Sequence, residues 1–163
     1  DPRTPTTLYA GTGIVFMLGF GDGVYKSTDG GAHWLPANTN LRNTDVRTLL
    51  IDTKAPQTLY AGTDRGVFKS LNGGASWASA SKGLPTGFVH ALVMEPHQSR
   101  VLYVGTSFGV FVSKDAGESW TSLNKGLTNL VVLSLSLPAS SPGTLYAGTS
   151  SGIFRLSVQG LRR

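Results

Sequence analysis

The chain has 163 residues, with 14 Lys or Arg, 9 Asp or Glu, 21 Gly and no Cys, and its formal net charge is +5. This length suits one domain with a buried core, and the charged fraction of 14% lies well below the roughly 25% of an average soluble domain. The composition therefore excludes a charged disordered tail, a long-helix protein, a disulfide scaffold and a Cys-ligated metal centre.

The basic excess does not form a patch. Arg3, Arg162 and Arg163 lie at the chain ends, and the other Lys and Arg residues are scattered singly, which is typical of a solvated surface rather than a nucleic-acid interface. No segment approaches the roughly 20 apolar residues of a membrane span, and the opening residues lack the basic and then apolar run of a signal peptide. We expect no nucleic-acid partner and no membrane span. The compartment stays open, with a secreted or periplasmic location favoured.

A six-residue segment recurs along the chain. TLYAGT at residues 7–12 returns at 58–63 and 144–149, and VLYVGT occupies 101–106. The last three copies start 43 residues apart, and the first interval is eight residues longer. A fixed period of this size indicates a repeat architecture.

The eight additional residues are Gly13–Phe20, GIVFMLGF, of which six are apolar. Apolar residues on a loop are costly when exposed. We expect this insert to cover an open sheet edge, contact another chain, line a ligand site or pack on its own repeat.

Each repeat contains short strand patterns separated by turn residues. The second repeat predicts strands at 46–52, 58–63, 66–70 and 76–79, and the third at 89–95, 101–106, 109–113 and 119–122. Four strands every 43 residues are typical of one β-propeller blade. The sequence therefore predicts an all-β fold, a propeller arc of about 3.5 four-stranded blades.

We assign residues 1–163 to one domain, with approximate blades 1–45, 46–88, 89–131 and 132–163. The first blade lacks its innermost strand, and the last ends after its third strand at about Ser157. An arc exposes an apolar face at each end. We therefore expect self-association or the remainder of a larger propeller, with a compact four-bladed monomer as the alternative.

The motif S-x-D-x-G-x-x-W stands three times between the third and fourth strands of a repeat. An Asp or Asn in a turn accepts backbone N–H groups, the Gly permits a positive φ, and the Trp covers the turn. Because Ala116 replaces the first of the two glycines, we expect only Gly117 to need the unusual backbone. We call each copy a box and assign it a structural role. The box residues are Ser27, Asp29, Gly31, Trp34; Ser70, Asn72, Gly74, Trp77; and Ser113, Asp115, Gly117, Trp120.

Three such motifs in register resemble the Asp-box (BNR-type) repeat family. That family includes sialidases, xyloglucan-cleaving glycosidases, sortilin-type receptors and a photosystem assembly factor. The resemblance implies a β-propeller of Asp-box hairpins, and it says little of function because the members do unrelated things.

Function in propellers usually resides at the channel mouth, on loops carried by a rigid frame. By analogy with other propellers, we expect the mouth at the loops between second and third strands and at the inner strands. Residues at these places, most of them polar, vary from one repeat to the next while the frame stays constant. The ligand-binding candidates are Arg47, Asp64, Arg65, His90 and Phe108. The histidines His33, His90 and His97 share no metal-ligand spacing, so we expect neither a metal nor a cofactor.

These observations favour a non-enzymatic binding or assembly module whose ligand is a carbohydrate or a protein. The alternative is part of a sialidase-like or xyloglucanase-like glycoside hydrolase. Xyloglucanase-like chemistry requires two facing carboxylates, and no pair stands out. Sialidase-like chemistry requires an arginine cluster, a tyrosine nucleophile and acidic partners, and the tyrosines Tyr9, Tyr60, Tyr103 and Tyr146 occupy one repeated frame position. We therefore assign no catalytic residue and favour a protein that is not an enzyme. A second alternative is a structural propeller fragment without its own activity.

Overall fold

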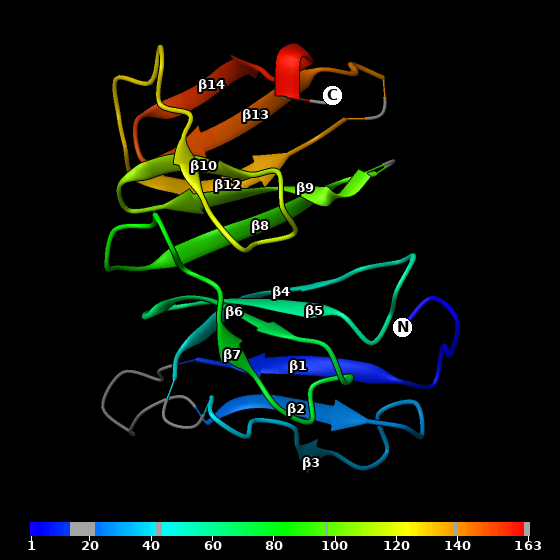
Figure 1. Ribbon diagram of the computed structural model, residues 1–163. Coiled ribbons are helices and arrows are strands. Elements are labelled where there is room, and N and C mark those ends of the chain that lie inside the picture. The colour runs from blue at the N-terminus through cyan, green and yellow to red at the C-terminus, as the bar shows by residue number, and fades with distance from the viewer. Residues whose placement is uncertain (14–21, 42–43, 97, 139, 162–163) are drawn as a thin grey trace.

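The computed structural model describes residues 1–13, 22–41, 44–96, 98–138 and 140–161, and it consists of four antiparallel sheets of three or four strands (Figure 1). The first sheet contains β1 (Leu8–Thr12), β2 (Gly23–Ser27) and β3 (Leu35–Pro36). The second contains β4 (Val46–Ile51), β5 (Leu59–Thr63), β6 (Gly66–Ser70) and β7 (Ala78–Ser79). The third contains β8 (Val89–Glu95), β9 (Gln98–Thr106), β10 (Gly109–Ser113) and β11 (Thr121–Ser122). The fourth contains β12 (Val132–Ser136), β13 (Thr144–Thr149) and β14 (Gly152–Ser157), and a short 3-10 helix, η1, follows at Gln159–Leu161.

The all-β, propeller-like architecture predicted from the sequence is confirmed. The outer strands β7 and β11 are shorter than predicted and begin only after the box Trp, because the box turn occupies the preceding residues. Strand β9 begins at Gln98, earlier than predicted. Residues 14–20 of the apolar insert, and His97, lie outside the described residues. The described part of the chain contains no helix long and apolar enough to cross a membrane.

The sheets lie side by side, with the first and the fourth at opposite ends of the arc (Figure 1). The strands of each sheet are paired in chain order, and β1, β4, β8 and β12 form a row in which each contacts the next. An apolar cluster fills each space between neighbouring sheets. Equivalent leucines of the last three sheets, Leu59, Leu102 and Leu145, are at most 1% exposed. Each of these three sheets therefore buries one face against the sheet before it.

The three boxes share one hydrogen-bond pattern. In the first, the Ser27 hydroxyl donates to Asp29 Oδ1 over 2.8 Å and accepts the Gly31 N–H over 2.9 Å. The His33 N–H donates to Asp29 Oδ1 over 3.0 Å. The second and third boxes repeat these bonds through Asn72 and Asp115. Each turn thus satisfies its own backbone donors.

The box carboxylates are held in the ionised form. Hydrogen bonds from the His33 N–H, the His33 ring and the Ser27 hydroxyl lower the pKa of Asp29 to about 2. Burial of Asp115 opposes ionisation, but hydrogen bonds from Ser119 and Ser113 outweigh it and lower the pKa of Asp115 to about 2. A carboxylate held in this state serves as a fixed acceptor rather than as an acid catalyst.

The box tryptophans also connect neighbouring sheets. The indole N–H of Trp77 donates to the Ala37 carbonyl over 2.8 Å, and that of Trp120 donates to the Ala80 carbonyl over 2.7 Å. These acceptors lie in the preceding sheet, directly after β3 and β7. The indole of Trp34 instead donates to its own Gly31 carbonyl over 3.0 Å. Trp34 is 39% exposed, against 2% for Trp77 and 3% for Trp120, because no described sheet packs against that face of the first sheet.

The expectation for Ala116 was wrong. Ala116 has a φ of 62°, and the equivalent Gly30 and Gly73 have φ values of 74° and 65°. Both central positions of the third box are therefore left-handed. The Ala116 carbonyl accepts hydrogen bonds from the Tyr60 hydroxyl and Lys69 Nζ, and its N–H donates to Arg100. These bonds hold an alanine in a conformation that favours glycine.

We predict that Ala116→Gly raises the free energy of unfolding by about 0.5–1 kcal/mol. Relief of the left-handed strain, roughly 1–2 kcal/mol, exceeds the entropy that glycine adds to the unfolded chain, about 0.4–1 kcal/mol. Chemical denaturation measures the change. Ala75→Gly is the matched control, because Ala75 of the second box has no positive φ, and it should lower stability. A loss of stability in Ala116→Gly would contradict the strain.

We also predict that Trp120→Phe lowers the free energy of unfolding by about 1–3 kcal/mol, since it leaves the Ala80 carbonyl without its buried donor. Trp34→Phe should cost clearly less, because Trp34 is exposed and bonds only within its own turn. Urea titration of the two variants makes the comparison. Equal losses would show that the bond between sheets contributes nothing beyond the turn itself.

Candidate functional site

The inner strands β4, β8 and β12 carry equivalent β-bulges, each near the start of its strand. Strand pairing shifts between Val46 and Thr48, between Val89 and Ala91, and between Val132 and Ser134. The additional residues at these shifts are Arg47, His90 and Leu133. A bulge changes the direction of its side chain and is frequent beside functional sites.

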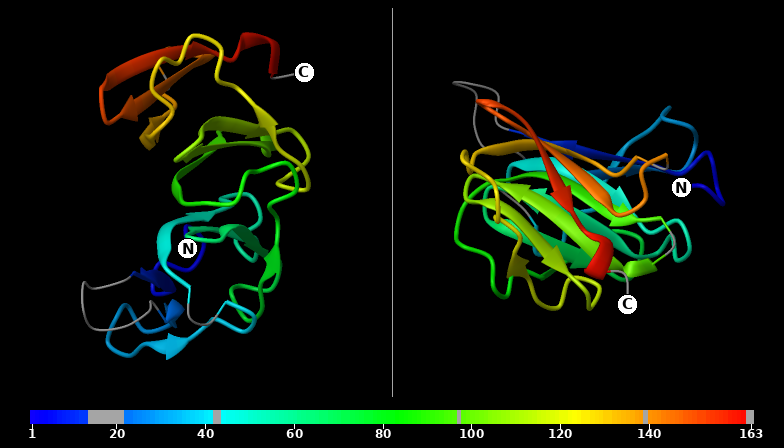
Figure 2. Two further views of the ribbon diagram at one scale, coloured as in Figure 1. Left: turned by 90° about the vertical axis from the view of Figure 1, so that its left-hand side faces the viewer. Right: turned by 90° about the horizontal axis from the view of Figure 1, so that it is seen from above.

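The bulges lie beside the turns that join the second and third strands of each sheet. We call the side of the molecule that carries these bulges and turns the mouth. The mouth lies on the left in Figure 1 and faces the viewer in the left view of Figure 2. The mouth residues are Asp45, Arg47, Asp64, Arg65, Phe88, His90, Ser107, Phe108, Leu130, Val131 and Leu133.

Three neighbours orient the guanidinium of Arg47. Its Nη2 and Nε lie 2.9 and 3.0 Å from Asp45 Oδ2. Its Cζ lies 4.1 Å from the centroid of the Phe88 ring. Its Nη1 lies 3.3 Å from His90 Nδ1. An ion pair to a carboxylate that is only 6% exposed and a cation–π contact together preorganise this cation.

The same contacts determine the proton position on His90. A guanidinium only donates hydrogen bonds, so Nδ1 of His90 accepts and Nε2 carries the proton that it donates to Ser107 Oγ over 3.1 Å. Burial lowers the pKa of His90 below 6.5, and the charge of Arg47 lowers it further. His90 is therefore neutral at pH 7, and its ring stacks on Phe88 with centroids 5.9 Å apart.

The other predicted ligand residues lie at the same end but differ in their contacts. Asp64 Oδ1 accepts the Asp45 N–H over 3.1 Å, so this carboxylate anchors the turn. Arg65 is mostly exposed, with its Nε 3.9 Å from Asp64 Oδ2. Phe108 is 46% exposed and contacts Gly87, before the third sheet.

Sequence reasoning named Arg47 and His90 as ligand-binding candidates but did not name Asp45 and Phe88, which contact Arg47. Asp45 and Phe88 occupy the same place in successive repeats, directly before the inner strand, and Val131 occupies it next. This variation within the 43-residue frame was the available signal. The sequence did not show that the side chains of adjacent repeats meet.

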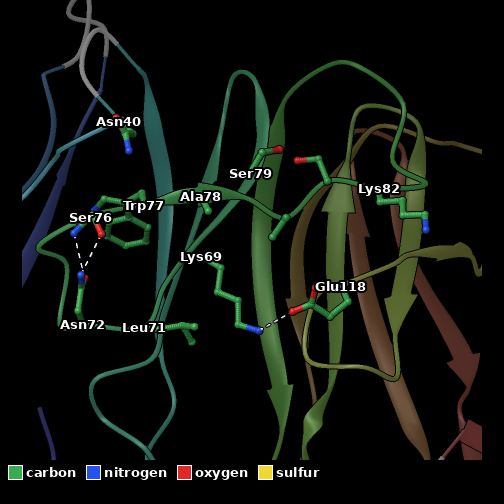
Figure 3. Close-up of a pocket in the computed structure, with 12 residues that line it drawn as sticks. Asn40, Lys69, Leu71, Asn72, Ser76, Trp77, Ala78, Ser79, Lys82 and Glu118 are labelled. Carbon is green, nitrogen blue, oxygen red and sulfur yellow. Dashed lines mark hydrogen bonds and ion pairs between the residues drawn. The ribbon is translucent and has the colours of Figure 1, made fainter.

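A hollow of about 550 Å³ lies at the outer edge along β7 (Figure 3). Lys69 Nζ lies 3.1 Å from Glu118 Oε1, and Asn72 Nδ2 donates to Ser76 Oγ over 2.9 Å. Both interactions involve box residues of the second and third sheets. A smaller hollow of about 230 Å³ lies between β1 and β4 and includes Arg47. Among the described residues, no group of three or more His, Asp or Glu could hold a metal ion.

Comparison with solved structures identifies the class of fold. An ancestral GH74 enzyme is 22% identical with a TM-score of 0.77, covering 97% of this chain and 22% of its own. PorZ, a surface component of the type-IX secretion system of Porphyromonas gingivalis, is 16% identical with a TM-score of 0.70, covering 93% and 24%. YCF48 bound to D1 peptide is 15% identical with a TM-score of 0.57, covering 89% and 52%.

These neighbours have β-propeller-type folds, and this chain is a partial propeller that spans about a quarter of the GH74 enzyme and of PorZ and about half of YCF48. At these identities the similarity concerns the fold alone. No protein-family description and no curated protein sequence matches the chain.

We predict that Arg47→Ala raises the pKa of His90, because it removes an adjacent positive charge. NMR titration of the histidine rings measures this shift, with His33, which pairs with Asp29, as an internal reference. The pKa of His90 in the folded protein is below 6.5. The unfolded chain therefore takes up its proton first as the pH falls, and the free energy of unfolding decreases between pH 6.5 and the lower folded-state pKa. An equal rise in the pKa of His90 in the control variant Lys82→Ala would contradict this role of Arg47.

Proposed function

We propose that this chain is a non-enzymatic binding or assembly module, one propeller domain over residues 1–163, whose mouth binds a segment of another protein. One observation carries the proposal: the preoriented guanidinium of Arg47 lies against Phe88 and at the same mouth as further exposed apolar side chains. Phe88 is 40% exposed and Leu133 50%. Phe108, Leu130 and Val131 are also exposed.

The chemistry of the mouth favours a protein over a carbohydrate. Exposed large apolar side chains gathered at one end of a molecule mark a protein contact surface, and Arg47 supplies one directed cation for a carboxylate. The carboxylates of Asp45 and Asp64 are already bonded to Arg47 and to a backbone N–H, so they offer little to sugar hydroxyls. A bound peptide in the YCF48 structure supports the same class of ligand.

Part of a glycoside hydrolase is the second candidate, supported by the similarity to GH74 enzymes. The reaction needs one carboxylate that donates a proton and a second that acts as base or nucleophile. Asp45 and Asp64 of the mouth both have structural partners, so neither is well placed to act as this acid or base. A structural fragment without its own activity is the third candidate, and it leaves the preoriented Arg47 unexplained.

We also propose a secreted or periplasmic location. The support is general: the neighbours include a surface component of a secretion system and an extracellular domain. We assign no metal and no cofactor to the mouth.

The proposal predicts binding to short peptides that combine apolar residues with a carboxylate. Parallel screens on a peptide array, a glycan array and soluble xyloglucan compare the three candidates. Phe108→Ala and Arg47→Ala should each weaken the best peptide about tenfold, or about 1.4 kcal/mol, while Lys82→Ala at the outer hollow leaves it unchanged. Binding on the glycan array alone, or release of reducing sugar, would overturn the proposal.

A further inference from the structure

A tyrosine and a cation face each other across two paired strands in three of the four sheets. Tyr9 pairs with Lys26 in the first sheet and Tyr60 with Lys69 in the second. In the fourth sheet Tyr146 pairs with Arg155. The third sheet places Val112 opposite Tyr103.

In the first two sheets this pair donates hydrogen bonds to the box of the next sheet. The Tyr9 hydroxyl and Lys26 Nζ both donate to the Gly73 carbonyl, over 3.1 and 3.4 Å. The Tyr60 hydroxyl and Lys69 Nζ both donate to the Ala116 carbonyl, over 3.0 and 2.8 Å. Each lysine also lies over the ring of its tyrosine. We call this arrangement the clamp.

The clamp is formed only in a sheet whose next sheet contains a box. The fourth sheet has no box, and in the preceding third sheet Val112 stands in place of the cation. Val112 is buried in one apolar cluster with Tyr103 and Val158. The fourth sheet nevertheless has both clamp residues. Its Ile153 is 79% exposed, although Val24, Val67 and Val110 at the equivalent positions are 0% exposed.

A box without a clamp lies at the other end of the arc. A Cβ atom added to Gly73 would lie 3.4 Å from both Tyr9 Oη and Lys26 Nζ, whereas one added to Gly30 would have no atom of the described residues within 4 Å, its chain neighbours aside. The face of the first sheet toward this open side is less buried than the equivalent faces of the other sheets. It carries Leu8, Ala10, Tyr25 and Trp34, which correspond to Leu59, Ala61, Phe68 and Trp77 in the second sheet.

We propose that the fourth sheet of one copy docks head to tail on the first sheet of a second copy. The Tyr146 hydroxyl and the Arg155 guanidinium donate to the Gly30 carbonyl of that copy, and Ile153 packs against its open apolar face. The contact continues the one between sheets already present in the chain, and it joins two different faces, so it is a heterologous contact. This docking is independent of the ligand proposed for the mouth.

Light scattering over a concentration series tests the docking. The wild-type chain should exceed its monomer mass of 17.2 kDa, and Ile153→Asp and Ala10→Lys, which block one face each, should both be monomers with unchanged circular dichroism. An equal mixture of the two variants should form a one-to-one dimer, because each retains one intact face. A monomeric wild type, or a mixture that stays monomeric, would overturn the proposal.

The clamp itself is tested by a second series. Arg155→Ala should weaken self-association about tenfold, about 1.4 kcal/mol, while Arg155→Lys restores it, since lysine fills this position in the first two sheets. Lys114→Ala removes an equal charge elsewhere and should have no effect. Equal self-association of Arg155→Ala and wild type would exclude the clamp. The peptide screens on the mouth use the monomeric Ile153→Asp variant, so failure of one proposal does not affect the other.

Discussion

A sheet of three or four short strands cannot bury both of its faces alone, so every sheet of this chain depends on its contact with a neighbour. That contact has an apolar part, the clusters that include Leu59, Leu102 and Leu145, and a polar part that fixes the register. Trp77 and Trp120 donate backward to the preceding sheet, and Tyr9 and Tyr60 donate forward to the next box. Hydrogen bonds in both directions thus fix the second sheet relative to the first and the third relative to the second.

The boxes make these contacts precise. Each Ser and its Asp or Asn satisfy the donors of a tight turn, and the low pKa values of Asp29 and Asp115 follow from that bonding. The carboxylates that recur in the boxes therefore have a structural role, as hydrogen-bond acceptors within the turns. We therefore propose the ligand site where the frame varies, which is at the bulges and the turns beside them.

The mouth and the end faces are different surfaces with different chemistry. The mouth combines the oriented Arg47 and the neutral His90 with exposed apolar side chains. The end faces carry the residues of a contact between sheets, with Tyr146 and Arg155 at one end and Gly30 at the other. Similarity to GH74 enzymes, PorZ and YCF48 concerns the frame that all of them share. Function must therefore be argued from the variable residues.

The repeat, the turn residues and the alternation of apolar positions were enough to predict the all-β fold and most strand bounds, because these depend on local backbone preference and on burial at a fixed period. Arg47 and His90 could be chosen as site residues for the same reason, since they vary at one position of a constant frame. The sequence did not predict the left-handed Ala116, the bulges or the contacts of Arg47 with Asp45 and Phe88. These depend on how the side chains of one sheet meet those of the next. That meeting is decided by hydrogen bonds between residues about 40 positions apart and by the register of the inner strands, which only the tertiary structure establishes.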